Sequence, residues 1–197
     1  MSRFKDGTNV KLNFKEYAHK AMKTASFKTN DYPLLLIMEE VTEVYEKIEM
    51  RAVKVEDIYK ELGDLSWGFA AFAMVMRFDL NALTDEVLKA LPASHERPKT
   101  DLSLLVECGN LVSLISKLSR KTGASADDVI DVVAYPTDEK TSDLNRQIFD
   151  QLVNCLKQWI YLCRALDVYP ADIMTMNIEK LKGRKERGTL EGSGDSR

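Results

Sequence analysis

The sequence predicts an all-α protein, and three observations support this fold class. Apolar residues recur at spacings of three and four through most of the chain, which is the pattern of helices that bury one face. No segment alternates apolar and polar residues over the length of a strand. Only 5 prolines and 9 glycines occur among the 197 residues, which disfavours a loop-rich all-β architecture.

Turn and capping signals separate the predicted helices. Pro33 suits a first helical turn and follows Asn30 and Asp31, either of which can cap it. Asp79 can cap a short helix that ends near Pro92, and the turn at 135–138 separates two later helices. We therefore expect helices at about residues 13–26, 33–50, 56–78, 79–91, 102–122, 125–133, 142–166 and 170–183, followed by an irregular tail over 184–197.

The clearest linker is residues 92–100, which carry two prolines and several charges. It divides the chain into a half at 1–91 and a half at 101–197. A chain with 45% apolar residues should bury a sizeable core. We expect the two halves to pack as one globular unit.

Composition excludes several classes of protein. The net charge of −3 argues against a protein that coats a nucleic-acid polymer. The longest apolar stretch, 65–76, is too short to span a bilayer, and the N-terminus has no signal-peptide core. Three cysteines without a CxxC pair indicate neither a disulfide framework nor a zinc knuckle. We therefore expect a reduced, cytoplasmic protein that does not bind membranes.

Two acidic pairs are the most informative feature. Glu40 and Glu43 lie three apart in one predicted helix, and Glu61 and Asp64 lie three apart in the next. Carboxylates at this spacing point to the same side of a helix. The second helix is apolar almost all round from 65 to 76, so it must be buried.

Four converging carboxylates can stay ionised if they share a divalent cation. Ligands that offer only oxygen favour Mg²⁺, with Mn²⁺ as a substitute. The alternative is an ordinary charged helix face with local ion pairs. The second acidic pair, on a buried helix, favours the metal site.

Glu39-Glu40-x-x-Glu43 followed by Glu61-x-x-Asp64 resembles the EExxE…ExxD signature of the MazG-like, all-α nucleoside triphosphate pyrophosphohydrolases. The string KELGDLSW is similar to the third helix of that family, and the tail from 177 to 197 resembles one bacterial and phage branch. The resemblance covers 14–80 and about 150–197. It implies Mg²⁺-dependent cleavage of a (d)NTP, or a related nucleotide, to the monophosphate and pyrophosphate.

The resemblance also suggests roles for other residues. Glu39 is a weak candidate for the general base. Lys180, Arg184 and Arg187 are candidates for binding the phosphates, although a basic helix C-terminus also complements the helix dipole. Two aromatic residues, Trp67 and Tyr17, are candidates for stacking on the base, although aromatics at helical spacing are more often part of the core.

The second half can be aligned on the first as a decayed repeat. Residues 104–117 align with 36–47, and 166–168 with 78–80. Amides then replace most of the carboxylates: Glu107 aligns with Glu40, Asn110 with Glu43, Gln151 with Glu61 and Asn154 with Asp64. The alternative is coincidental helical similarity. If the repeat is real, a homodimer would reproduce the four-unit assembly of the family.

Two other interpretations remain open from the sequence. The first is a non-catalytic helical interaction protein whose acidic faces bind basic partners without a metal. The second is another member of the superfamily, such as a phosphoribosyl-ATP pyrophosphohydrolase. The sequence does not identify the base; dUTP, dCTP and a guanosine alarmone are all candidates.

Overall fold

The computed structural model describes residues 12–50, 54–91 and 102–188. Within these ranges the chain contains eight α-helices and one 3₁₀ turn and no strand, so the all-α prediction is confirmed. The elements are α1 (Phe14–Ala21), η1 (Met22–Thr24), α2 (Tyr32–Glu49), α3 (Val55–Val75), α4 (Leu80–Ala90), α5 (Ser103–Thr122), α6 (Ala126–Ala134), α7 (Glu139–Ala165) and α8 (Pro170–Glu186).

Several helix boundaries differ from the prediction. α1 ends at Ala21 and its 3₁₀ turn at Thr24, short of the expected 26, and α3 ends at Val75 instead of 78. α7 begins at Glu139 instead of 142, because Asp138 and Thr141 form a reciprocal capping box at its start. α8 continues to Glu186, so residues 184–186 of the expected irregular tail are helical. The linker at 92–100 and the tail from 189 lie outside the described residues.

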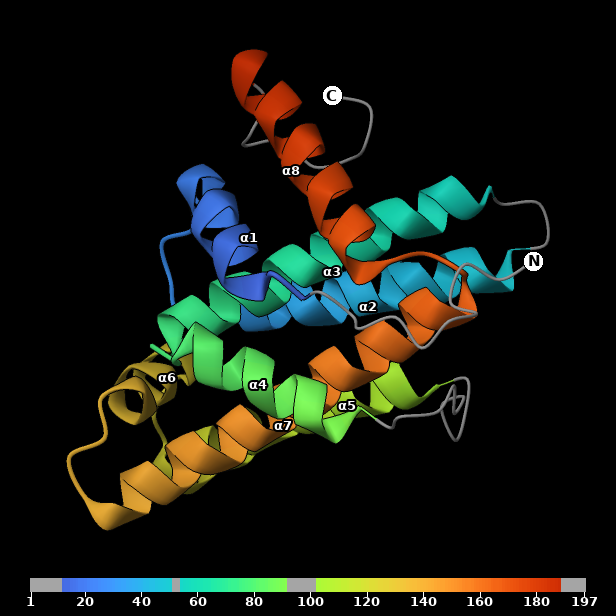
Figure 1. Cartoon of the computed structure of the whole chain (residues 1–197). Helices are drawn as coiled ribbons and strands as arrows, with labels where there is room; N and C mark the ends of the chain where they lie inside the picture. Colours follow the sequence, from blue (N-terminus) through green and yellow to red (C-terminus); the bar gives the residue numbers. More distant parts are fainter. Residues whose placement is uncertain (1–11, 51–53, 92–101, 189–197) are drawn as a thin grey trace.

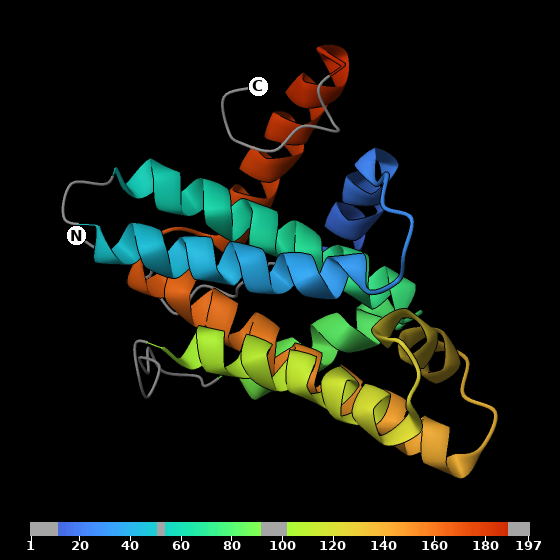
Figure 2. The same ribbon diagram turned by 180° about the vertical axis from the view of Figure 1, so that it is seen from behind.

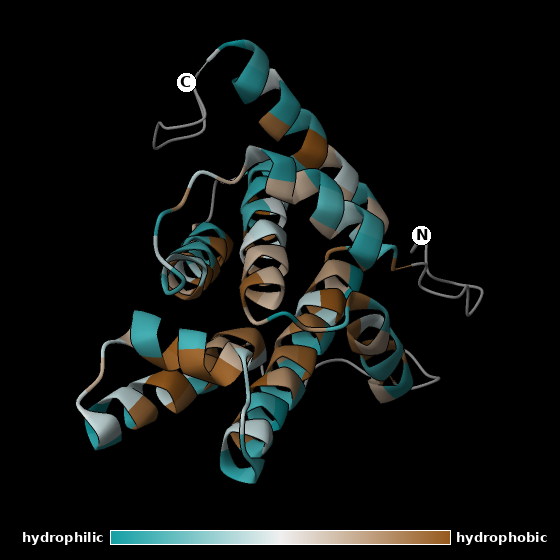
Figure 3. Cartoon of the chain, turned by 90° about the vertical axis from the view of Figure 1, so that its left-hand side faces the viewer, coloured by the Kyte–Doolittle hydropathy of each residue, from teal (hydrophilic) through white to brown (hydrophobic). Residues whose placement is uncertain are grey.

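Two antiparallel helix pairs form the centre of the molecule. α2 lies along α3, α5 lies along α7, and α2 also packs against α5 (Figure 1, Figure 2). Figure 3 shows brown and teal alternating along most helices, as expected for helices that bury one face. The buried faces meet in one core, which includes Ile37, Val41, Leu62, Phe69 and Trp159.

The helices that follow α3 and α7, namely α4 and α8, cross between the pairs. α4 follows α3 in sequence but packs on α7, whereas α8 follows α7 but packs on α3 and α1 (Figure 1). Side chains link the pairs as well: the Trp159 indole donates a hydrogen bond to the Leu62 carbonyl over 3.1 Å. The Phe78 and Phe149 rings meet edge to face at 5.2 Å. The two halves therefore share one core.

α3 and α7 end in the same turn. Arg77 and Asp167 both have left-handed backbone conformations, with φ of 56° and 57°. In each turn the next residue donates a 3.0 Å hydrogen bond back into the helix, from Phe78 to Ala73 and from Val168 to Cys163. The shared turn aligns Asp167 with Arg77. The predicted alignment of 166–168 with 78–80 paired Asp167 with Asp79, two residues further along, and was wrong. The corrected offset of 90 residues is the one that aligns Gln151 with Glu61. This agreement supports the repeat, which stays a prediction.

The described residues include no helix with the length and apolar character needed to cross a bilayer. The three cysteines, Cys108, Cys155 and Cys163, are free and buried. Burial raises the pKa of the Cys163 thiol, so it stays protonated and unreactive. These thiols belong to the core, as expected for small buried side chains.

Candidate metal centre

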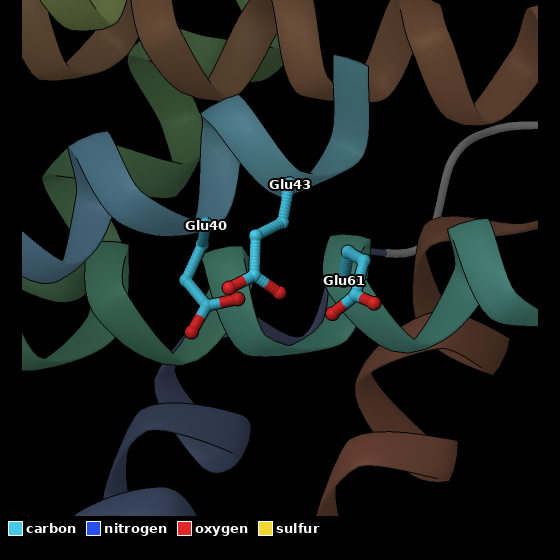
Figure 4. A group of neighbouring side chains, drawn as sticks. All are labelled: Glu40, Glu43 and Glu61. Carbon is cyan, nitrogen blue, oxygen red and sulfur yellow. The ribbon is translucent and has the colours of Figure 1, made fainter. Parts of the chain in front are cut away.

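Three carboxylates from two helices converge at the surface between α2 and α3. Glu40 and Glu43 lie one turn apart on α2 and point toward Glu61 on α3 (Figure 4). One oxygen from each lies within 4.8 Å of the others. The neighbouring residues Val41 and Val44 are fully buried in the seam, which brings these glutamates to its edge. The predicted convergence is therefore present for three of the four acids.

Burial and mutual repulsion make this cluster electrostatically unfavourable without a counter-ion. The pKa of Glu40 is raised to about 9, chiefly by burial and then by the negative charges of Asp64, Glu43 and Glu61. Glu61 is only 3% exposed, and the Lys47 ammonium lies 3.7 Å from its Oε1. The raised pKa favours a proton on Glu40 at neutral pH in the metal-free chain.

Asp64 lies one turn along α3 from Glu61, outside this group of three. Its Oδ2 accepts a hydrogen bond from the Lys180 ammonium at 2.5 Å, and its Oδ1 accepts one from the Asn177 amide at 2.8 Å. Both partners come from α8. Lys180, expected at the phosphates, instead pairs with an expected metal ligand in this structure. The charge of Lys180 also acts on Glu40, where it lowers the pKa.

Asn177, which is buried with 2% exposure, was not among the residues that the sequence pointed to. It lies three residues before Lys180 on α8, and this spacing was a usable signal for a shared helix face. Gly63 lets α8 approach α3: a Cβ at this position would lie 3.1 Å from the Asn177 Cβ. Because the sequence did not reveal which helix α8 packs on, the role of Asn177 could not be inferred.

Tyr17 and Trp67 lie in different environments. Tyr17 is 4% exposed, and burial raises the pKa of its hydroxyl, which donates to Asn177 Oδ1 over 2.8 Å. Its ring is enclosed by the core, which does not favour stacking on a base. Trp67 is half-buried, with its indole N–H 3.4 Å from the Ala21 carbonyl and its ring edge-on to Phe27. Only Trp67 retains an accessible surface of useful size.

The other expected residues lie around this centre. Glu39 is exposed and adjacent to Glu40, outside the group of three. Arg184 lies one turn beyond Lys180 on α8 and is half-buried. Arg187 is exposed at the C-cap of α8, and its guanidinium folds back toward Gly183. The two arginines therefore extend a basic face along α8 from Lys180.

The aligned positions of the second half hold a hydrogen-bonded pair. The Gln151 side-chain amide donates to the Glu107 carboxylate at 2.7 Å and to the Glu107 backbone carbonyl at 3.0 Å. Lys157 donates to the Asn154 side-chain oxygen at 3.3 Å. The Gln151 amide therefore gives the Glu107 carboxylate a hydrogen-bond partner, so this carboxylate needs no metal ion.

Comparisons with known proteins agree with this geometry. The sequence model of the MazG nucleotide pyrophosphohydrolase domain matches residues 28–97, a range that contains α2 and α3. The gene 37 protein of Mycobacterium phage L5 is 30% identical over 96 residues, which cover 49% of this chain and 72% of the phage protein. The chain belongs to the MazG nucleotide pyrophosphohydrolase family.

The family assignment confirms the resemblance stated from the acidic motifs. The MazG match includes Glu40, Glu43, Glu61 and Asp64 but ends before α8 begins. No solved structure matches the chain. The contribution of α8 to the centre therefore comes from the tertiary structure of this MazG-family chain itself.

Proposed function

We propose that this MazG-family chain is a Mg²⁺-dependent nucleotide pyrophosphohydrolase that cleaves a (d)NTP, or a related nucleotide, to the monophosphate and pyrophosphate. The observation that carries this proposal is the convergence of Glu40, Glu43 and Glu61 within 4.8 Å, on the helices where the family match lies. An oxygen-only donor set fits a hard divalent cation. A shared cation would also offset the repulsion that raises the pKa of Glu40.

Glu40, Glu43 and Glu61 would hold the cation, with Asp64 as a fourth ligand. When bound, Mg²⁺ or Mn²⁺ supplies charge neutralisation at the phosphates and lowers the pKa of coordinated water. Hydrolysis joins a water oxygen to the α-phosphorus and breaks its bond to the bridging oxygen, which leaves with pyrophosphate. Glu39 is exposed and adjacent to the cluster, and it remains the candidate for accepting the proton of the water.

Cations from α8 would bind the triphosphate. Lys180 already lies at the edge of the acidic centre, and Arg184 and Arg187 follow it along the helix. Trp67, half-buried at the other side of Asp64 on α3, is the proposed stacking partner for the base. For Tyr17, buried beneath Asn177, we propose a positioning role in place of stacking.

The proposal includes a homodimer, no nucleic-acid polymer as partner, and a reducing cytoplasmic location. The three free, buried thiols suit that compartment. Light scattering should give a mass of two chains of 22.4 kDa each. A monomer mass would remove the dimer from the proposal and leave the hydrolase activity untouched.

The test is pyrophosphate release from a panel of canonical and modified nucleotides, with Mg²⁺ and with EDTA. We expect at least one nucleotide to be cleaved with Mg²⁺ and none with EDTA. Millimolar Mg²⁺ should also raise the melting temperature of the wild-type chain, because a ligand that binds only the folded state stabilises it.

Glu43→Gln and Glu107→Gln provide the matched pair of variants for this test. Each removes one carboxylate, from α2 in the first half and from α5 in the second half. We expect Glu43→Gln to abolish both the activity and the Mg²⁺ shift, and Glu107→Gln to preserve them. If no nucleotide is cleaved and Mg²⁺ does not shift the melting temperature, the hydrolase proposal is wrong and the interaction-protein interpretation is favoured.

A further inference from the structure

A buried chain of hydrogen bonds leads from the core to Asp64. The Tyr17 hydroxyl donates to Asn177 Oδ1, and the Asn177 amide donates to Asp64 Oδ1, each over 2.8 Å. The Ser66 hydroxyl lies 2.8 Å from the Tyr17 oxygen and 2.6 Å from the Gly63 carbonyl. α1, α3 and α8 each contribute at least one member of this chain.

The order of donors and acceptors determines the orientation of the Asn177 amide. Tyr17 supplies a hydrogen to the amide oxygen, so the NH₂ group faces Asp64. The reverse orientation would set the amide oxygen against a carboxylate oxygen and lose both hydrogen bonds. A buried polar network of this kind holds its members in one arrangement, because a partly satisfied arrangement costs free energy.

We infer that Asn177, oriented by Tyr17, is a positioning residue that holds Asp64 Oδ1 and thereby leaves Oδ2 as the oxygen offered to the divalent cation. Lys180 occupies Oδ2 in this structure. Asn177 acts through Asp64 and does not touch the nucleotide. This inference rests on the proposed metal-dependent function, and it adds to that function a contribution from α1 and α8.

The contact of α4 with α7 provides an internal comparison for this network. With the offset of 90 residues given by the matching turns, the polar members on α3 and α8 correspond to other residue types. Asn177 corresponds to Val87, Lys180 to Ala90, Ser66 to Leu156, Gly63 to Val153 and Asp64 to Asn154. Val87 on α4 and Leu156 on α7 are fully buried, so apolar side chains fill these places where α4 packs against the second helix pair.

This difference separates a structural role from a functional one. If the network served only to hold helices together, the apolar contact of α4 with α7 shows that it could be replaced. Its polar members occur where α8 packs on α3, beside the three converging carboxylates. Their arrangement is therefore better explained by the need to orient Asp64 than by stability.

The experiment measures Mn²⁺ binding to the full chain without nucleotide, by electron paramagnetic resonance. Tyr17→Phe removes only the hydroxyl that orients Asn177, and Asn177→Ala removes the amide itself. Groups that orient metal ligands are typically worth about 10- to 100-fold in metal affinity. We expect Asn177→Ala to weaken Mn²⁺ binding by about that factor, and Tyr17→Phe by about 3- to 10-fold.

The matched control is Tyr59→Phe. The Tyr59 hydroxyl on α3 donates a hydrogen bond to the Leu166 carbonyl at the end of α7, over 3.1 Å, and it is not a member of the buried chain of hydrogen bonds described above. We expect this variant to lower the melting temperature about as much as Tyr17→Phe while it leaves the Mn²⁺ affinity unchanged. An equal loss of affinity in both phenylalanine variants would indicate general destabilisation and overturn the inference.

Other outcomes separate this inference from the proposed function. Wild-type Mn²⁺ affinity in Tyr17→Phe and Asn177→Ala, in an enzyme that still releases pyrophosphate, contradicts the positioning role alone. A wild-type chain that binds no Mn²⁺ and cleaves no nucleotide contradicts both. If either variant unfolds, the other still decides the question, since the two act on the same carboxylate.

Discussion

The helix pairs α2/α3 and α5/α7 have the same arrangement of helices. They differ in the charge of the side chains at one place, where the first pair has its acidic centre. Both are antiparallel, and α3 and α7 end in the same left-handed turn. Aligned core positions are buried in both pairs: Ile37 with Leu104, Val41 with Cys108, Val44 with Leu111, Leu62 with Leu152, and Phe69 with Trp159. Both pairs are held by a buried apolar face, but the first pair has four carboxylates where the second has three amides and the single carboxylate of Glu107.

This comparison separates what the fold needs from what the site needs. An apolar seam suffices to hold two helices together, since it removes apolar surface from water. Clustered carboxylates oppose folding, and the pKa of Glu40, raised to about 9, reflects that opposition. The second pair relieves it by pairing Glu107 with an amide donor. Four predictions test this contrast, from the largest expected effect to the smallest.

Loss of a converging carboxylate should affect activity far more than loss of its counterpart. Glu61→Gln should lower kcat/KM by about 1000-fold, because charge neutralisation by a bound metal contributes several kcal/mol to transition-state stabilisation. At the aligned position, Gln151→Ala should change kcat/KM by less than about twofold. Steady-state pyrophosphate release measures both variants. Comparable losses in both would mean that the second pair also takes part in catalysis.

The stability of the metal-free chain should depend on pH through Glu40. Its pKa is raised from 4.5 to about 9 on folding, so the folded state binds this proton more tightly than the unfolded state. The resulting stabilisation is complete below about pH 4.5 and is lost as the pH rises toward about 9. It should amount to a few kcal/mol, given about 1.4 kcal/mol for each pKa unit.

Denaturant unfolding in EDTA, from pH 5 to 9, measures this effect. Glu40→Gln should flatten the dependence, because its amide does not titrate in this range. Adding Mg²⁺ to the wild-type chain should stabilise it most at high pH, where no proton competes for the carboxylates. A wild-type profile parallel to that of Glu40→Gln would contradict the raised pKa.

A carboxylate introduced into the α5/α7 pair should reproduce the charge repulsion found in the α2/α3 pair. Gln151→Glu replaces an amide donor with a charge that faces Glu107. We expect the free energy of unfolding to fall by about 1–3 kcal/mol at pH 8, the typical cost of a lost hydrogen bond at a partly buried charge. Gln151→Met, similar in length but uncharged, is the control. We expect the free energy of unfolding of Gln151→Glu to return to the wild-type value near pH 4.5. An equal loss of this free energy at pH 4.5 and at pH 8 would rule out charge as the cause.

Lys180 should compete with the divalent cation for Asp64. Its ammonium lies 2.5 Å from Asp64 Oδ2, so removing the charge takes away one competitor of the metal ion for this oxygen. Lys180→Met should therefore bind Mn²⁺ about 3- to 10-fold more tightly without nucleotide, since one nearby charge contributes about 1 kcal/mol. It should also raise KM for the nucleotide. Weaker Mn²⁺ binding in this variant would contradict the competition.

The sequence by itself determined the helices and the acidic face. Spacings of three and four residues predicted every helix, and the pairs Glu40/Glu43 and Glu61/Asp64 indicated their shared faces because helical geometry is local. The resemblance to the MazG-like family followed from these same residues. Among the boundaries that differed, those at Glu139 and Glu186 depended on a capping box and on the contacts of the last helix.

Only the tertiary structure decided which helix each face meets. α8 packs on α3 instead of its sequence neighbour α7, where Gly63 leaves room for Asn177. That contact pairs Lys180 with Asp64 and gives the Tyr17 hydroxyl a partner, neither of which periodicity could reveal. The physical reason is the sequence separation of the interacting residues. A helix forms through contacts between residues one turn apart, whereas its packing partner is selected by complementary surfaces of segments that are far apart in the chain.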